Sequence, residues 1–248
     1  MRLALAGALC AGTLALALPA GAQPADDCLG LAWTARTGSE ARVLYRQTLG
    51  GREVETRRVR QRTLGPARLE GRETTAVEET VETQAAGGGP ATTTINLHHG
   101  RWTAEPPGLR RYGLEQRSAP TGTAAAVAAP GAADSTLRRF VHDPPTDDPR
   151  PSLKPGRLAV LEERVRSGDA PPVLSRTRIQ FVGIESLPLP TGPVRACRFD
   201  ETTETPAGPP RRVWLHLGTG VMLRLESGPR ASLSTKAVEF TVDGAVPR

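Results

Sequence analysis

The alternation of apolar and polar residues between positions 177 and 227 is the clearest structural signal in the chain. Apolar, β-branched and aromatic residues alternate with polar ones, and clusters of Gly and Pro interrupt them at short intervals. Runs of this kind, bounded by turn residues, are typical of antiparallel strands. The pattern predicts four consecutive strands, over residues 177–187, 194–203, 211–217 and 221–227.

The last two predicted strands carry matching rows of apolar side chains. Alternate residues of a strand point to the same face, and the Gly-Thr-Gly sequence at 218–220 joins the two strands as a hairpin. A large exposed apolar patch is rare on a soluble monomer, so these rows either pack under other strands or bind an apolar ligand. The candidate face for such a ligand consists of Val213, Leu215, Leu217, Val221, Leu223 and Leu225.

Strand patterns also occur elsewhere, and turn residues separate them. Gly50-Gly51 predicts a tight hairpin turn, and Leu64-Gly65-Pro66 predicts another. We expect an all-β fold in which residues 23–248 form a single domain. Its core is one curved antiparallel sheet of roughly ten or more strands, a half-barrel or open barrel.

Residues 118–157 differ in composition from the rest and predict a long connection within this domain. The segment 118–135 contains mostly Ala, Pro and Gly, and 142–155 is rich in proline. Proline cannot donate a hydrogen bond to a neighbouring strand. We therefore expect the connection to be flexible and to lie outside the sheet. A short helix over residues 123–129 is an alternative for part of it.

The first 22 residues predict a signal peptide. Arg2 precedes an apolar run at 3–18, and Ala20-Gly21-Ala22 matches the small-residue cleavage pattern. The run is too short to favour a transmembrane span. After cleavage two cysteines, Cys28 and Cys197, would remain in an oxidising compartment, which favours a disulfide between them over two free thiols. The sequence thus predicts a periplasmic or secreted protein.

The composition limits the function classes. The net charge is +6, and all 32 basic residues except Lys154 and Lys236 are arginine. A GC-rich genome is the simpler explanation of this excess of arginine. The alternative is a surface that binds an anionic lipid or an acidic partner. Export, together with the lack of interleaved basic and aromatic residues, argues against nucleic-acid binding.

The sequence predicts no catalytic, metal or cofactor site. It lacks the Gly-x-Ser-x-Gly elbow, the Walker loop, the dinucleotide fingerprint and the His-Glu-x-x-His motif. His98 and His99 are adjacent, so in a strand they point to opposite faces and do not chelate one ion together. We expect a protein that is not an enzyme and that needs no cofactor.

The C-terminal half resembles a known group of proteins. Glycine, proline and tryptophan recur in the segments Val182–Glu185, Leu189–Gly192, Ala196–Phe199, Val213–Leu215 and Gly218–Val221. This pattern is similar to exported proteins of Gram-negative bacteria that resemble the curved-sheet lipoprotein carriers of the LolA/LolB kind. The resemblance covers residues 140–228 and implies a half-barrel with a concave face.

Two functions are compatible with these features. In the first, the protein is a non-enzymatic interaction module of the bacterial envelope, with an envelope protein as partner. In the second, it is a carrier or chaperone that binds a lipid or a lipidated partner on the concave face. Uptake of a fluorescent fatty acid would separate them.

Overall fold

The structure is a computed structural model that describes residues 27–103, 107–120 and 137–247. The predicted signal peptide and most of the Ala/Pro-rich segment lie outside the described residues.

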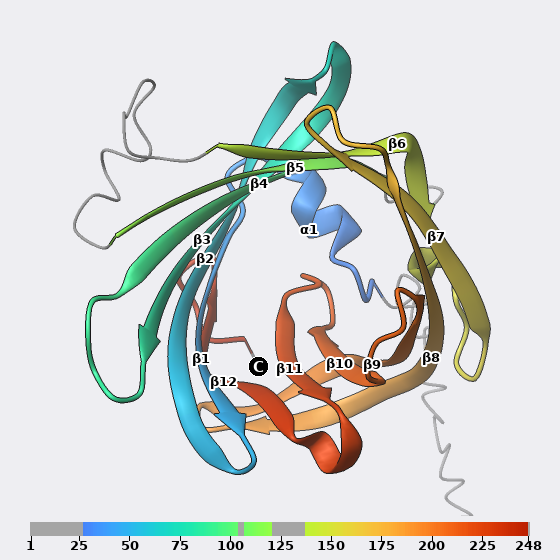
Figure 1. Ribbon diagram of the computed structural model, residues 1–248. Helices are drawn as coiled ribbons and strands as arrows, with labels where there is room; N and C mark the ends of the chain where they lie inside the picture. Colours follow the sequence, from blue (N-terminus) through green and yellow to red (C-terminus); the bar gives the residue numbers. More distant parts are fainter. Residues whose placement is uncertain (1–26, 104–106, 121–136, 248) are drawn as a thin grey trace, which may run out of the picture.

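Twelve antiparallel strands surround a common axis and form a closed barrel (Figure 1). All neighbours but one follow the chain order, because short turns join most of the strands into hairpins. A short helix, α1 (Leu31–Ala35), precedes them, and two 3-10 turns, η1 (Arg150–Ser152) and η2 (Pro229–Ala231), interrupt them. The strands are β1 (Glu40–Leu49), β2 (Arg52–Leu69), β3 (Arg72–Ala85), β4 (Thr92–Thr103), β5 (Gly108–Pro120), β6 (Arg138–Asp148), β7 (Leu158–Ser167), β8 (Val173–Leu189), β9 (Gly192–Thr205), β10 (Arg211–His216), β11 (Met222–Ser227) and β12 (Leu233–Val242).

The first and last strands pair and close the barrel. The register of β1 and β12 runs from Ala41 opposite Val242 to Leu49 opposite Leu233. The prediction of an all-β antiparallel fold is confirmed, but the predicted half-barrel or open barrel is wrong. Closure gives both edge strands a partner, and it removes the unpaired N–H and C=O groups that an open sheet would expose.

The connection at 118–157 is more regular than the sequence predicted. Strand β5 reaches Pro120, and β6 covers 138–148, so the expectation that the whole segment lies outside the sheet is wrong. Pro144 and Pro145 fit within β6 because the register jumps there: Gly113 pairs with Val141, and Arg111 pairs with Thr146. The prolines thus lie in an irregular stretch where a strand tolerates the loss of a donor.

The pairing of β6 with β7, which we call the β6–β7 seam, has three register pairs and is the shortest in the barrel, and the pairing of β11 with β12 follows with four. Only Phe140, Val141 and His142 of β6 find partners on β7, namely Ser167, Arg166 and Val165. Beyond His142, β6 pairs only with β5, and residues 158–165 of β7 pair with β8. Few backbone hydrogen bonds therefore hold this seam.

Two hydrophobic cores stabilise the described part of the barrel. The first packs Trp33 of α1 against β1, β9, β11 and β12, with Val43, Leu223 and Phe240 among its members. The second surrounds Cys28 and Cys197 and includes the stacked rings of Phe181 and Phe199, whose centroids are 5.1 Å apart. In Figure 1, α1 lies within the outline of the ring. It fills part of the space inside the barrel, and the strand faces that point towards it are the inner faces.

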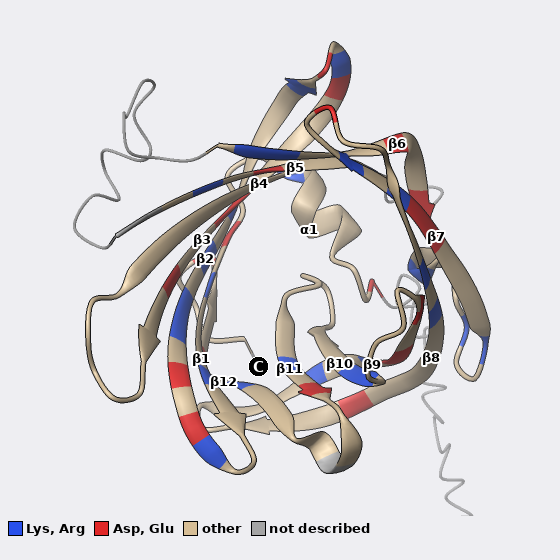
Figure 2. Cartoon of the chain, viewed as in Figure 1, with Lys and Arg blue, Asp and Glu red and all other residues tan. Residues whose placement is uncertain are grey.

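Charged residues of both signs are distributed around the barrel. Figure 2 shows Lys and Arg interspersed with Asp and Glu along the strands, rather than gathered on one side. Many of the arginines form ion pairs across neighbouring strands; Arg60, for example, lies 2.7 Å from Glu40. Such cross-strand pairs stabilise a sheet modestly.

Candidate functional site

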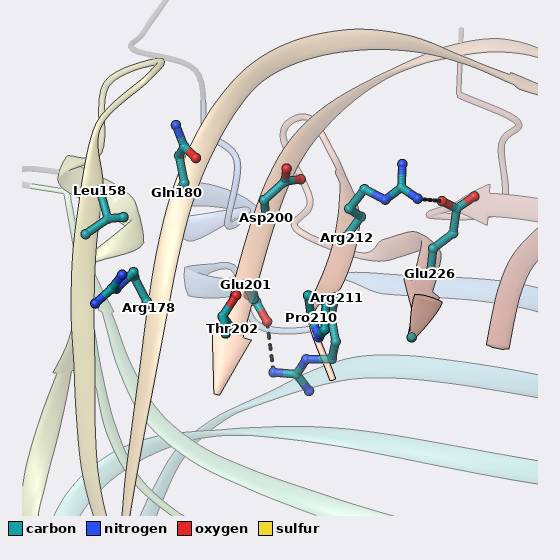
Figure 3. Close-up of a pocket in the computed structure, with 11 residues that line it drawn as sticks. Leu158, Arg178, Gln180, Asp200, Glu201, Thr202, Pro210, Arg211, Arg212 and Glu226 are labelled. Carbon is teal, nitrogen blue, oxygen red and sulfur yellow. Dashed lines mark hydrogen bonds and ion pairs between the residues drawn. The ribbon is translucent and has the colours of Figure 1, made fainter. Parts of the chain in front are cut away.

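One hollow among the described residues is a trough on the barrel surface, lined by side chains of both charges. It has a volume of about 320 Å³ and lies at the ends of β10 and β11. We call it the outer trough; Figure 3 shows its side chains. Its lining residues are Leu158, Arg178, Gln180, Asp200, Glu201, Thr202, Pro210, Arg211, Arg212, Glu226 and Gly228.

The charged side chains of the outer trough are held in ion pairs. Arg212 lies 3.1 Å from Glu226, and Arg211 lies 2.9 Å from Glu201 (Figure 3). Two other lining residues pair with partners outside the trough: Arg178 with Glu204 at 2.8 Å, and Asp200 with Arg198 at 3.0 Å. The surface is thus rich in charge but nearly neutral, and it suits a partner with both donors and acceptors.

Exposed apolar side chains flank the trough on the same face of the sheet. Leu158 lies opposite Gln180, and Val160 lies opposite Arg178, so all four share one face. Leu158 is 53% exposed and Val160 is 37% exposed. Val182 and Leu174, also on β8, are exposed as well. Apolar residues beside paired charges are the usual composition of a protein–protein interface.

A chain of buried charges runs from the outer trough into the barrel. Glu201 accepts from Arg211 on one side and from Arg150 on the other, where Arg150 lies 2.6 Å from the carboxylate. Arg150 also pairs with Asp148 at 2.9 Å, and Arg111 joins Asp148 to Glu163. We call these six residues the buried charge network.

The network joins strands that are not neighbours in the barrel. Asp148 ends β6, Arg150 lies in η1, and Glu201 belongs to β9. The side chain of Asp148 is fully buried and that of Glu201 is 5% exposed. Buried charges are tolerated only when they are paired and hydrogen-bonded, so each member depends on the others.

Both central groups of the network stay ionised. Burial on its own would raise the pKa of Asp148, but the charges of Arg150 and Arg111 outweigh burial and lower that pKa. Burial would lower the pKa of Arg150, but Asp148 and Glu201 outweigh it and raise that pKa. Asp148 and Arg150 therefore act as fixed charges near neutral pH.

The structure places four of the six predicted apolar residues in or against the two cores. Val221 and Leu223 are buried in the first core, whereas Leu215 and Leu217 pack against the second. Val213 lies opposite Leu225, and both are half-buried. A register shift after Trp214 places Leu215 opposite Met222. Protein atoms thus cover most of the two rows.

Trp214 is a buried structural residue whose surroundings the sequence did not reveal. It alternates with Val213 and Leu215 along β10, and it is also buried: it is 4% exposed and packs in the first core. The Arg198 and Arg224 guanidinium groups lie 5.6 and 4.8 Å from its ring centre, and its indole N–H donates to Glu185. These arginines are its register partners, which only the strand pairing reveals.

The N-terminal segment is attached to the turn between β10 and β11. Cys28 and Cys197 form a disulfide across 169 residues of sequence. The amide of Gly218 donates to the Asp27 carbonyl at 2.8 Å. A Cβ on Gly220 would lie 2.3 Å from the Leu29 carbonyl oxygen, so the Gly-Thr-Gly turn serves close backbone packing here.

The described residues contain no group of three or more His, Cys, Asp or Glu side chains suited to hold a metal ion. His98 faces Glu79, whereas His99 bonds to Thr74.

Within the described ranges, no helix has the length and apolar character needed to cross a bilayer.

No protein-family model matches the sequence, and no curated protein does either. Two solved structures are similar to the chain. One is described as a lipoprotein from Parabacteroides distasonis; it has 10% identity and a TM-score of 0.41, and the match covers 87% of this chain and 100% of that one. The other is described as an exported protein with a YmcC-like fold from Bacteroides fragilis; it has 10% identity and a TM-score of 0.43, and the match covers 83% and 96%.

Both descriptions refer to exported proteins or lipoproteins, and neither states an activity. Neither names a lipoprotein carrier, so the similarity to LolA and LolB stays a prediction from the sequence.

Proposed function

We propose that this protein is an exported, non-enzymatic interaction module of the bacterial envelope. In this proposal the outer trough and its flanking residues dock another envelope protein. The observation that carries the proposal is the coincidence of exposed Leu158 and Val160 with the trough on one sheet face. Partly apolar surface that borders paired charges is favourable to bury against a protein of matching shape.

The export part of the proposal rests on the sequence and on the disulfide. The apolar run before Ala20-Gly21-Ala22 has the features of a signal peptide. Disulfides such as Cys28–Cys197 persist in oxidising compartments and are rare in the cytosol.

The non-enzymatic part rests on the state of the charges in the outer trough. Arg178, Arg211 and Arg212 each pair with a carboxylate. A general base needs a carboxylate or imidazole that is free to take up a proton at working pH. The trough carboxylates are committed to arginines, which suits recognition better than proton transfer.

Site-specific photo-cross-linking in the envelope tests the docking surface. A photoreactive residue at Val160 should capture one specific protein, whereas the same residue at Leu49, which is 55% exposed on the β1–β2 turn, should not. Arg178→Glu should abolish that capture without changing the thermal midpoint by more than a few degrees, because both members of the Arg178–Glu204 pair are partly exposed. Equal capture from both positions would contradict the proposal.

The alternative carrier function has its own measurement. Most of the two predicted apolar rows is covered by protein, so we expect the purified protein not to take up a fluorescent fatty acid. Saturable uptake that displaces no trough partner would favour the carrier instead.

A further inference from the structure

The inner face of the barrel can be followed from strand to strand by register. Val43 and Ala41 of β1 are buried in the first core together with Trp33 of α1, so they face the interior. Directly opposed residues of antiparallel strands share a face. Val59 lies opposite Val43, and Gln61 lies opposite Ala41. Both β2 residues therefore face the interior.

The same register continues across the next three strands. Glu79 of β3 lies opposite Gln61, Asn96 of β4 lies opposite Glu79, and Gln116 of β5 lies opposite Asn96. A row of four polar residues thus crosses the inner face of β2 to β5. We call Gln61, Glu79, Asn96 and Gln116 the inner polar wall.

Hydrogen bonds between the side chains fix three members of the wall. The Gln116 amide donates to Asn96 Oδ1 at 3.0 Å, and the Asn96 amide donates to Glu79 Oε2 at 2.9 Å. His98 Nε2 lies 3.6 Å from the same Glu79 oxygen. Each amide has two N–H donors and a carbonyl, so donors and acceptors remain for a ligand after these bonds are made.

Solvent reaches this wall although it faces the interior. The side chain of Glu79 is 30% exposed and that of His98 is 42% exposed. Gln61, Asn96 and Gln116 are half-buried. By contrast, Ile179 and Leu223 in the two cores are fully buried. The inner polar wall is therefore more accessible to water than the two hydrophobic cores are.

The charge on the wall is balanced. Burial alone would raise the pKa of Glu79, but His98, the Asn96 amide and the charge of Arg57 outweigh it and lower that pKa. Glu79 is therefore ionised and already compensated. The wall offers a ligand amide and carboxylate groups in fixed positions, and an acyl chain packed against them would leave these polar groups without partners.

We propose that the inner polar wall binds a neutral, polyhydroxylated ligand of the oligosaccharide class. Each hydroxyl both donates and accepts, which matches a row of amides and a carboxylate held by one another. The site lies on the opposite face of the sheet from the docking surface proposed above. A result that contradicts one of the two proposals therefore leaves the other unaffected.

Asn96 provides a direct test because it is the only asparagine in the sequence. Labelling with ¹⁵N-asparagine gives one side-chain amide signal, located on the wall itself. We expect maltotetraose or cellotetraose at millimolar concentration to shift this signal saturably, and we expect oleate to leave it in place. The proposal would be overturned if neither sugar shifted the Asn96 signal, or if oleate shifted it.

Variants show whether the shift reports the wall. Gln116→Ala and Gln61→Ala should each weaken sugar binding by up to about tenfold, the effect of losing one neutral hydrogen bond. Gln84→Ala on the outer face of β3 is the matched control and should bind as the parent does. Equal weakening by all three substitutions, at unchanged thermal midpoints, would place the sugar elsewhere and contradict the assignment.

Discussion

At the scale of single residues, Arg150 is the side chain on which the buried charge network depends. It is the one member that contacts carboxylates from two non-neighbouring strands, Asp148 and Glu201. Arg150→Met keeps most of the volume but leaves both carboxylates without this partner. Because buried unpaired charges are costly, we expect a loss of about 3–5 kcal/mol in the free energy of unfolding. Chemical denaturation measures it.

An exposed pair of the same type provides the control. Arg110 pairs with Asp147 at 2.7 Å, but both side chains are more than half exposed. Arg110→Met should leave the free energy of unfolding nearly unchanged. Similar losses for the two variants would show that water reaches the buried charge network.

His216 makes stability depend on mildly acidic pH. Burial lowers its pKa to about 4, whereas an unfolded histidine titrates near about 6.5. Between these values the unfolded chain binds a proton that the folded chain does not. Stability is therefore complete above about pH 6.5 and falls as the pH is lowered towards 4, by an amount on the order of 3 kcal/mol. His216→Gln should flatten this part of the curve of stability against pH.

At the scale of elements, the turn between β10 and β11 depends on Gly220. Gly218 and Gly220 both have positive φ, 91° and 68°. The space beside Gly218 is open, whereas a Cβ at Gly220 would collide with the backbone of Leu29. Gly218→Ala should cost about 1–2 kcal/mol through backbone strain. Gly220→Ala should cost about 1–3 kcal/mol more, because the N-terminal segment must move. Comparison of thermal midpoints separates the two.

The disulfide holds the same segment covalently. Reduction removes a cross-link that closes a loop of about 170 residues, which on the loop-entropy model stabilises by up to about 5 kcal/mol. We expect reduction to lower the thermal midpoint, and mass spectrometry of exported protein to find Cys28 linked to Cys197. Two thiols that react with an alkylating agent in the native protein would contradict this.

The elements that the sequence predicted well are those fixed by local chemistry. Gly50-Gly51 does form the turn between β1 and β2, because glycine adopts the positive φ that such turns need. Leu64-Gly65-Pro66 was predicted as a turn, but β2 continues through it to Leu69 with a register shift between Thr63 and Gly65. A bulge and a turn use the same residues, and only the partner strand distinguishes them.

The candidate site was less predictable than the elements. Alternation grouped Val213, Leu215 and Leu217 on one face, but a register shift after Trp214 splits the pairing. Asn96 and Gln116 gave no signal, because their relationship exists only across strands. Sequence patterns report which faces are apolar, whereas a site that spans several strands depends on register.

At the scale of the whole molecule, the β6–β7 seam should be where the barrel opens first. Few backbone hydrogen bonds cross it, and the contact of Arg111 with Glu163 links β5 to β7 beside it. Local opening follows the regions with the fewest stabilising contacts. Hydrogen exchange should show less protection for Val141 and Val165 than for Val43 and Phe240 at the β1–β12 closure. Equal protection at the two places would show that the barrel opens only as a unit.

The pairing of β1 with β12 has a consequence for how the protein reaches its folded state during secretion. A chain that crosses a membrane from its N-terminus delivers Glu40–Leu49 early and Leu233–Val242 nearly last. The disulfide likewise cannot form until Cys197 has crossed and can react with Cys28. Until the final strand has crossed, β1 presents an unpaired edge, which is the feature that favours aggregation. In a chain that is secreted, the final fold can therefore form only after translocation is almost complete, and β1 is the strand at which association with other chains must be avoided until then.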